Sequence, residues 1–133
     1  MLALVLGLTL LAIANGGAYA FQAQGFVERV RSVDQRAHLD ELRRLSAWNR
    51  WAARTQLVFM LGAFGLAMWG FNTGRFGGLG MLVFIGINGL IYFEGRWIKG
   101  LDQKIHNLPA APALVDEYRA IVADMKRGAR ITK

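Results

Sequence analysis

Three long apolar runs constrain this chain more than any other feature of its sequence. They lie within residues 1–24, 54–72 and 77–97, and each contains an uncharged stretch close to the ~20 residues that cross the core of a bilayer. Hydrophobic residues make up 54% of the chain although it carries 16 Lys and Arg, so the charges are concentrated between and after the runs. The sequence therefore predicts an all-α membrane protein with three transmembrane helices.

The end of the first run has two interpretations. Ala18-Tyr19-Ala20 is a small-x-small triplet after an apolar run, which is typical of a signal-peptide cleavage site. The alternative is an uncleaved membrane span. We favour the span, because the first residues carry no basic side chain and because cleavage would place both basic segments of the protein outside.

The distribution of Lys and Arg predicts the orientation. The segment between the first two runs has seven Arg against four acidic residues, and the tail from Glu94 onward has eight Lys and Arg against five, so each has a net charge of +3. The turn between the second and third runs has only Arg75. Because Lys and Arg near membrane ends favour the cytoplasm, we expect the N-terminus and the Arg75 turn outside and the C-terminus inside.

The expected organisation is then, in chain order, a first transmembrane helix at 1–24, a cytoplasmic amphipathic helix within 25–53, a second transmembrane helix at 54–72, an external turn at 73–76, a third transmembrane helix at 77–97, and a cytoplasmic tail at 98–133 with an amphipathic helix at 113–127. Helical spacing of apolar residues over 26–47 indicates the first amphipathic helix. Whether the first span continues into it unbroken or bends near Gly25 is left open. Aromatic residues that recur at the span ends are the expected interface anchors: Trp48, Trp51, Trp69, Tyr92 and Trp97.

The C-terminal helix is expected to have one apolar face and to end at Gly128 as its C-cap. The face is formed by Leu114, Tyr118, Ile121 and Met125. Two occupants are equally consistent with this pattern, namely an anionic lipid surface and a partner subunit.

Small residues at intervals of four predict where helices pack closely. Ala12, Gly16 and Ala20 form such a stripe in the first span, and Ala63 and Ala67 repeat the interval once in the second.

Three polar side chains lie within the spans. We expect Asn15 and Asn88 each to form an interhelical hydrogen bond, with a polar contact to a quinone, lipid or ion as the alternative. Glu94 lies close to the inner end of the third span, where Arg96 or Arg54 is its expected ion-pair partner; the alternative is a proton-transfer or ion-coupling role.

Several classes of function are disfavoured. There is no Cys, and both His38 and His106 lie outside the apolar runs, so the spans offer no thiolate and no imidazole to a metal or haem. No nucleotide-binding, metalloprotease or serine-hydrolase motif is present. The basic residues are mixed with acids beside the membrane, which argues against nucleic-acid binding.

These observations predict a small non-catalytic accessory or scaffold subunit of a larger bacterial inner-membrane complex, an energy-transducing one of the respiratory or photosynthetic kind. Its partners would be other membrane subunits and anionic lipids, with no cofactor held by its own ligands and with quinone or pigment contacts left open. One alternative is a self-assembling membrane-permeabilising protein, which resembles the three-span phage holins in its outside N-terminus and basic inside tail but departs from them in its long charged segment between spans one and two. Another is a small oligomeric transporter that uses Glu94 as its coupling carboxylate.

Overall fold

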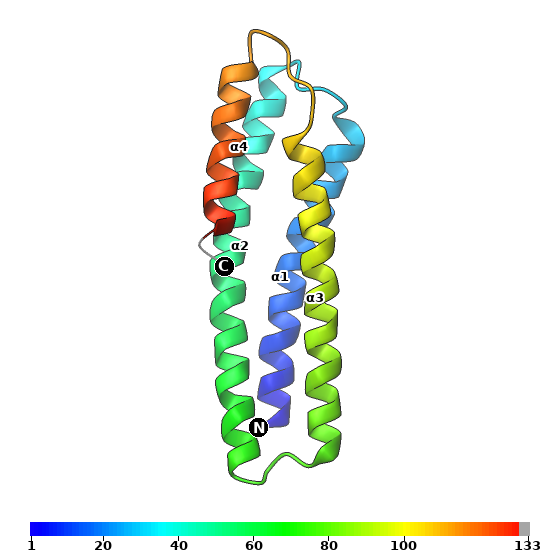
Figure 1. The fold of residues 1–133 in the computed structure, drawn as a ribbon, viewed down its shortest axis with the longest axis vertical. Coiled ribbons are helices and arrows are strands. Elements are labelled where there is room, and N and C mark those ends of the chain that lie inside the picture. Colours follow the sequence, from blue (N-terminus) through cyan, green and yellow to red (C-terminus); the bar gives the residue numbers. More distant parts are fainter. Residues whose placement is uncertain (131–133) are drawn as a thin grey trace.

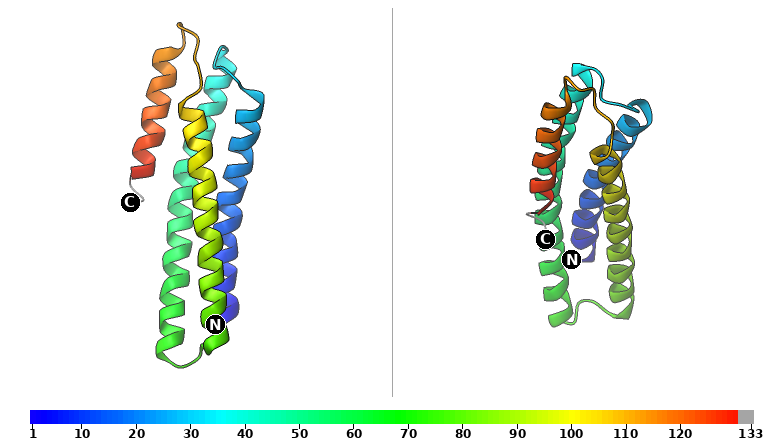
Figure 2. Two further views of the ribbon diagram at one scale, coloured as in Figure 1. Left: turned by 45° about the vertical axis from the view of Figure 1, so that its right-hand side comes forward. Right: turned by 45° about the horizontal axis from the view of Figure 1, so that its top comes forward.

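A computed structural model describes residues 1–130 as a bundle of four α-helices (Figure 1). The helices are α1 (Leu2–Arg29), α2 (Arg36–Asn72), α3 (Gly78–His106) and α4 (Val115–Arg130). The first three are each long and apolar enough to cross a membrane. Each of these three helices runs in the direction opposite to the one before it. The N-terminus therefore lies at the same end of the bundle as the turn between α2 and α3 (Figures 1 and 2).

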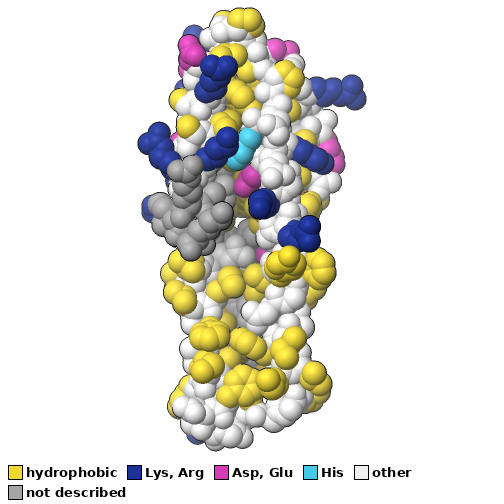
Figure 3. Space-filling model, viewed as in Figure 1, with side chains coloured by type: hydrophobic (Ala, Val, Ile, Leu, Met, Phe, Trp, Pro, Cys, Tyr) yellow, Lys and Arg dark blue, Asp and Glu magenta, His cyan; other side chains and the backbone are white. Residues whose placement is uncertain are grey.

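The molecule divides along its length into an apolar half and a charged half. We define the apolar half as residues 1–18 and 54–97 and the charged half as residues 19–53 and 98–130. Lys, Arg, Asp and Glu gather over one half of the surface, whereas hydrophobic and uncharged groups cover almost all of the other (Figure 3). The main buried core lies in the charged half, whereas the core of the apolar half is a small cluster around Val5, Ala63 and Ala67.

The helix predicted over residues 26–47 is divided in the structure. α1 passes straight through Gly25 to Arg29, residues 30–35 leave the helical path, and α2 then continues without interruption from the charged half into the apolar half. Hydrogen bonds to a distant segment hold the non-helical conformation of this break. The Val33 amide donates to the Pro109 carbonyl at 2.7 Å, and the Val33 carbonyl accepts from the Ala111 amide at 2.8 Å. This contact joins the α1–α2 connection to the α3–α4 connection.

The turn between α2 and α3 closes around one aromatic ring. Gly74 has φ 67°, a conformation that favours glycine, and the Arg75 amide bonds back to the Gly70 carbonyl. The ring of Phe76 lies between Gly70 and Gly80, and a methyl group at Gly70 would lie only 2.0 Å from it. Beyond the turn the two helices meet through large side chains, such as Phe64 and Phe84 with ring centroids 6.5 Å apart.

The face of the C-terminal helix is occupied within the chain. Leu114, Tyr118, Ile121 and Met125 are buried in the core of the charged half, where α4 packs along α2. The prediction that this face meets lipid or a partner is therefore wrong. The connection at 107–114 turns the chain back, so α4 lies along α2 (Figure 1). Its apolar face there shares one core with residues of α2 and α3.

Both ends of this helix also differ from the sequence prediction. It starts at Val115, two residues later than expected, and Gly128 lies inside it rather than at its C-cap because the helix continues to Arg130.

Candidate functional site

The three long helices converge on a buried carboxyl group where the two halves meet. Glu94 of α3 is 9% exposed and points between α1 and α2. The Gln56 side chain of α2 donates from Nε2 to Oε2 of Glu94 at 3.2 Å. Oε1 has no hydrogen-bond partner in the part of the chain that the structure describes.

Gly16 of α1 forms the floor beneath this carboxyl group. A methyl group at Gly16 would lie 2.8 Å from Oε1 and 2.9 Å from Cδ of Glu94, so only glycine lets the carboxyl group come this close. At the adjacent Gly17 the same methyl group would lie 3.6 Å from Oε1, which is an ordinary contact. We call Gly16, Gln56 and Glu94 the carboxyl seat.

A second interhelical bond lies beside the seat. The Asn15 amide donates from Nδ2 to the Ala52 carbonyl of α2 at 3.1 Å, one turn before Gln56. The interhelical bond expected for Asn15 is therefore present in the structure. Gln56 was missed from the sequence, although an amide near the start of an otherwise apolar run was a visible signal.

The ion pair expected for Glu94 is absent among residues 1–130. Arg54 and Arg96 are both exposed, and none of the ion pairs between described side chains includes Glu94. Two residues along a helix correspond to a rotation of about 200°, so Arg96 projects from the side of α3 opposite to Glu94.

Asn88 differs from its prediction as well. Its amide is exposed, and Nδ2 donates to the Phe84 carbonyl of its own helix at 2.7 Å rather than to another helix. The interhelical bond expected for Asn88 is therefore not formed among residues 1–130.

The small-residue stripe is used for packing inside the chain. Ala12, Gly16 and Ala20 are buried, and α1 packs against both α2 and α3. Ala63 and Ala67 are buried on α2 beside Val5.

The predicted anchor aromatics fall into two groups. Four of them are exposed, and they are Trp51, Trp69, Tyr92 and Trp97. Trp48 is half-buried and packs on the core of the charged half, three residues before the exposed Trp51 on α2.

Toward the charged half, α1 and α3 are joined by a tyrosine and an aspartate. The buried Tyr19 hydroxyl donates to Oδ1 of Asp102 at 2.8 Å. Burial raises the pKa of Asp102, and the hydrogen bond from Tyr19 partly opposes this shift. Neither residue was singled out from the sequence, because the pair joins positions 83 residues apart.

His106 lies near the end of α3 and close to α4. Burial, and secondarily the positive charge of Lys126, lower the pKa of this imidazole, so its neutral form is favoured. Its Nε2 has no hydrogen-bond partner among the described residues. No group of three or more His, Cys, Asp or Glu in residues 1–130 is arranged to hold a metal ion.

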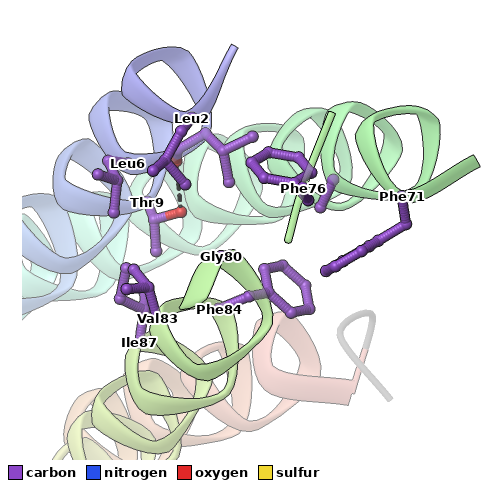
Figure 4. Close-up of a pocket in the computed structure, with 11 residues that line it drawn as sticks. Leu2, Leu6, Thr9, Phe71, Phe76, Gly80, Val83, Phe84 and Ile87 are labelled. Carbon is purple, nitrogen blue, oxygen red and sulfur yellow. Dashed lines mark hydrogen bonds between the residues drawn. The ribbon is translucent and has the colours of Figure 1, made fainter. Parts of the chain in front are cut away.

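The apolar half contains one small cavity between its three helices (Figure 4). It has a volume of about 10 Å³ and an almost entirely apolar lining that includes Leu6, Phe76 and Ile87. The Thr9 hydroxyl at its edge donates to the Val5 carbonyl one turn earlier. A space of this size holds at most about one water molecule, so it is a packing defect and not a ligand site.

Comparisons of the chain with protein-family models, with curated proteins and with solved structures found no match.

Proposed function

We propose that this protein is a small non-catalytic accessory subunit of a larger bacterial inner-membrane complex, an energy-transducing one, and that it acts by packing a membrane helix against another subunit. Its N-terminus lies outside and its C-terminus inside, because the +3 charge of each basic segment favours the cytoplasm. The charged half is then a cytoplasmic bundle with its own core.

The exposed amide of Asn88 carries this proposal. Asn88 lies near the middle of the third apolar run, ten residues after the start of α3 and nine before Trp97. Its bond to the Phe84 carbonyl uses one amide hydrogen, which leaves the second hydrogen and the side-chain carbonyl facing the hydrocarbon. Because an unsatisfied polar group there costs several kcal/mol, a helix that supplies a partner is strongly favoured over lipid.

Neighbouring residues extend this face along α3. Ile85 and Tyr92 lie one turn before and after Asn88 and are both exposed. Further along, an open groove of about 820 Å³ runs past Tyr92, Gly95 and Lys99. We call Ile85, Asn88, Tyr92 and Gly95 the Asn88 face, and its glycine leaves room for a close helix.

Site-specific photo-crosslinking in native membranes tests the proposal. A photoreactive residue replaces Ile85 on the Asn88 face, and a control places it at Val58 on α2, where exposure is similar, 66% against 56%. We expect a foreign membrane subunit, identified by mass spectrometry, to be crosslinked from Ile85 and not from Val58. Asn88→Leu should abolish its co-purification in mild detergent, whereas Val58→Leu should not.

Two other results would point elsewhere. Crosslinks between copies of this chain from Ile85 would favour the self-assembling, holin-like alternative, because Asn88 side chains from two copies can pair with each other. Crosslinks to lipid alone from both positions would contradict the subunit proposal.

A further inference from the structure

The carboxyl seat holds an acid that has lost its contact with water without gaining a positive partner. Glu94 is at least nine-tenths buried, and three helices enclose it. Its polar neighbour, Gln56, is uncharged. The seat is part of the fold itself, since Gly16 provides the space and Gln56 provides the donor.

The charges on the surrounding helices leave Glu94 unpaired among the described residues. Between Leu2 and Gln24, α1 has one titratable group, the Tyr19 hydroxyl, which bonds to Asp102. On α2, Arg50 pairs with Asp124 of α4. The remaining basic residues near the seat are Arg54 of α2 and Arg96 of α3, which are both exposed.

This environment favours a neutral acid over a carboxylate. An ionised carboxylate without a partner is strongly penalised at low dielectric, and proteins avoid the penalty by binding a proton. A neutral carboxyl group has one carbonyl oxygen, which needs a donor, and one hydroxyl oxygen. Gln56 donates to Oε2, which leaves Oε1 as the oxygen that carries the proton.

We propose that the carboxyl seat is a proton-binding site in which Oε1 of Glu94 holds a proton at neutral pH. The site is independent of the subunit role proposed above, because it depends on contacts within this chain only. The Tyr19–Asp102 pair lies on the side of the seat toward the charged half, since Tyr19 follows Gly16 by three residues or about 4.5 Å along α1.

Reaction with a hydrophobic carbodiimide tests this directly. The reagent reacts with a protonated carboxyl group, whose proton moves to a carbodiimide nitrogen while a carboxyl oxygen bonds to the central carbon; the adduct rearranges to a stable N-acylurea. The full-length protein in lipid nanodiscs is treated at pH 8 with dicyclohexylcarbodiimide, and the modified peptide is found by mass spectrometry. We expect modification at Glu94, none in Glu94→Gln, and none at the exposed Glu28.

Two neighbouring glycines supply a matched pair of variants. In Gly16→Ala the new methyl group would lie 2.8 Å from Oε1, so the Glu94 side chain must move away from α1. We expect this shift to weaken the seat and to bring the carboxyl group into more polar surroundings, where its ionised form is favoured. In Gly17→Ala the corresponding distance is 3.6 Å, and the seat is kept. We expect the modified fraction at pH 8 to fall several-fold in Gly16→Ala and to stay at the native level in Gly17→Ala.

A second measurement requires no glycine variant. Infrared spectra of the native protein at pH 8 should contain a carboxylic-acid C=O stretch that is missing from Glu94→Gln. The proposal is overturned if the native protein lacks both this band and the modification. Protection of Glu94 by Na⁺ at constant pH would also overturn it, because the occupant would then be a metal cation. Equal loss of modification in the two glycine variants would refute the role of Gly16.

Discussion

Removal of the Tyr19 hydroxyl should show how much its hydrogen bond to Asp102 contributes to stability, apart from the contribution of the buried ring. Tyr19 is 1% exposed, and its hydroxyl is the donor that reaches Asp102 from α1 at 2.8 Å. In Tyr19→Phe the ring keeps its packing, but the half-buried carboxyl group of Asp102 loses a donor that water cannot easily replace.

The expected cost follows from the type of bond. A hydrogen bond contributes about 0.5–1.5 kcal/mol when its acceptor is neutral and about 1.5–3 kcal/mol when it is charged, so Tyr19→Phe should lower the free energy of unfolding by about 1–3 kcal/mol at neutral pH. The pH dependence has a definite sign. Burial raises the pKa of Asp102 above its unfolded value of 3.8, so the stability that its proton contributes is complete below pH 3.8 and is lost as pH rises through the folded pKa. Because Tyr19→Phe removes the contact that opposes this shift, its cost should be larger at pH 7 than below pH 3.8.

The assay is unfolding by sodium dodecyl sulfate in mixed micelles, followed by circular dichroism. Tyr92→Phe is the matched control, since its ring is 62% exposed and the same oxygen is removed. A double-mutant cycle with Asp102→Ala should give a coupling energy of at least ~1 kcal/mol. The reasoning is refuted if the two tyrosine variants cost the same, or if the cycle gives no coupling.

Three further predictions concern other parts of the chain. Burial and Lys126 lower the pKa of His106, so the stability that its neutral form contributes is complete above pH 6.5 and is lost as pH falls through the folded pKa; His106→Gln should reduce the loss of stability below pH 6.5, measured by the same unfolding assay. Gly70→Ala should destabilise the α2–α3 turn because its methyl group overlaps the Phe76 ring, whereas Gly65→Ala, where the space is open, should be neutral or slightly stabilising; thermal unfolding decides. A phosphatase that is active only in the periplasm should be inactive when it is fused to the C-terminus, because that end is proposed to lie in the cytoplasm. Phosphatase activity of the fusion would contradict the proposed orientation.

The sequence predicted those features of the fold that depend on local composition. The three apolar runs form three helices that are long and apolar enough to cross a membrane. This was predictable because a single apolar segment of this length can satisfy its backbone hydrogen bonds within a bilayer only as a helix. The break at 30–35 was not predictable, because apolar residues continue at helical spacing on both sides of it. It depends on the hydrogen bonds of Val33 with Pro109 and Ala111, which lie 76 and 78 positions further along the chain.

Periodicity also showed which residues of the last helix share a face without showing what covers that face. From the sequence, the apolar residues of α4 were equally consistent with lipid and with a partner. In the structure they lie instead in the core of the chain itself, because the connection at 107–114 turns α4 back along α2. The surroundings of Glu94 could be predicted only in part from the sequence. Helical rotation alone separates it from Arg96, but its contact with Gln56 joins positions 38 apart and appears only in the folded chain.

The carboxyl seat also gives a specific meaning to the stripe of small residues in α1. Ala12 and Ala20 keep their methyl groups and are fully buried, so close helix packing on this face does not itself require glycine. Gly16, at the centre of the stripe, is where a methyl group would collide, and the atoms that it would meet belong to a side chain rather than to a helix backbone. The interval of four therefore reflects helix packing, whereas the glycine at its centre reflects the need to hold the carboxyl group of Glu94 between three apolar helices.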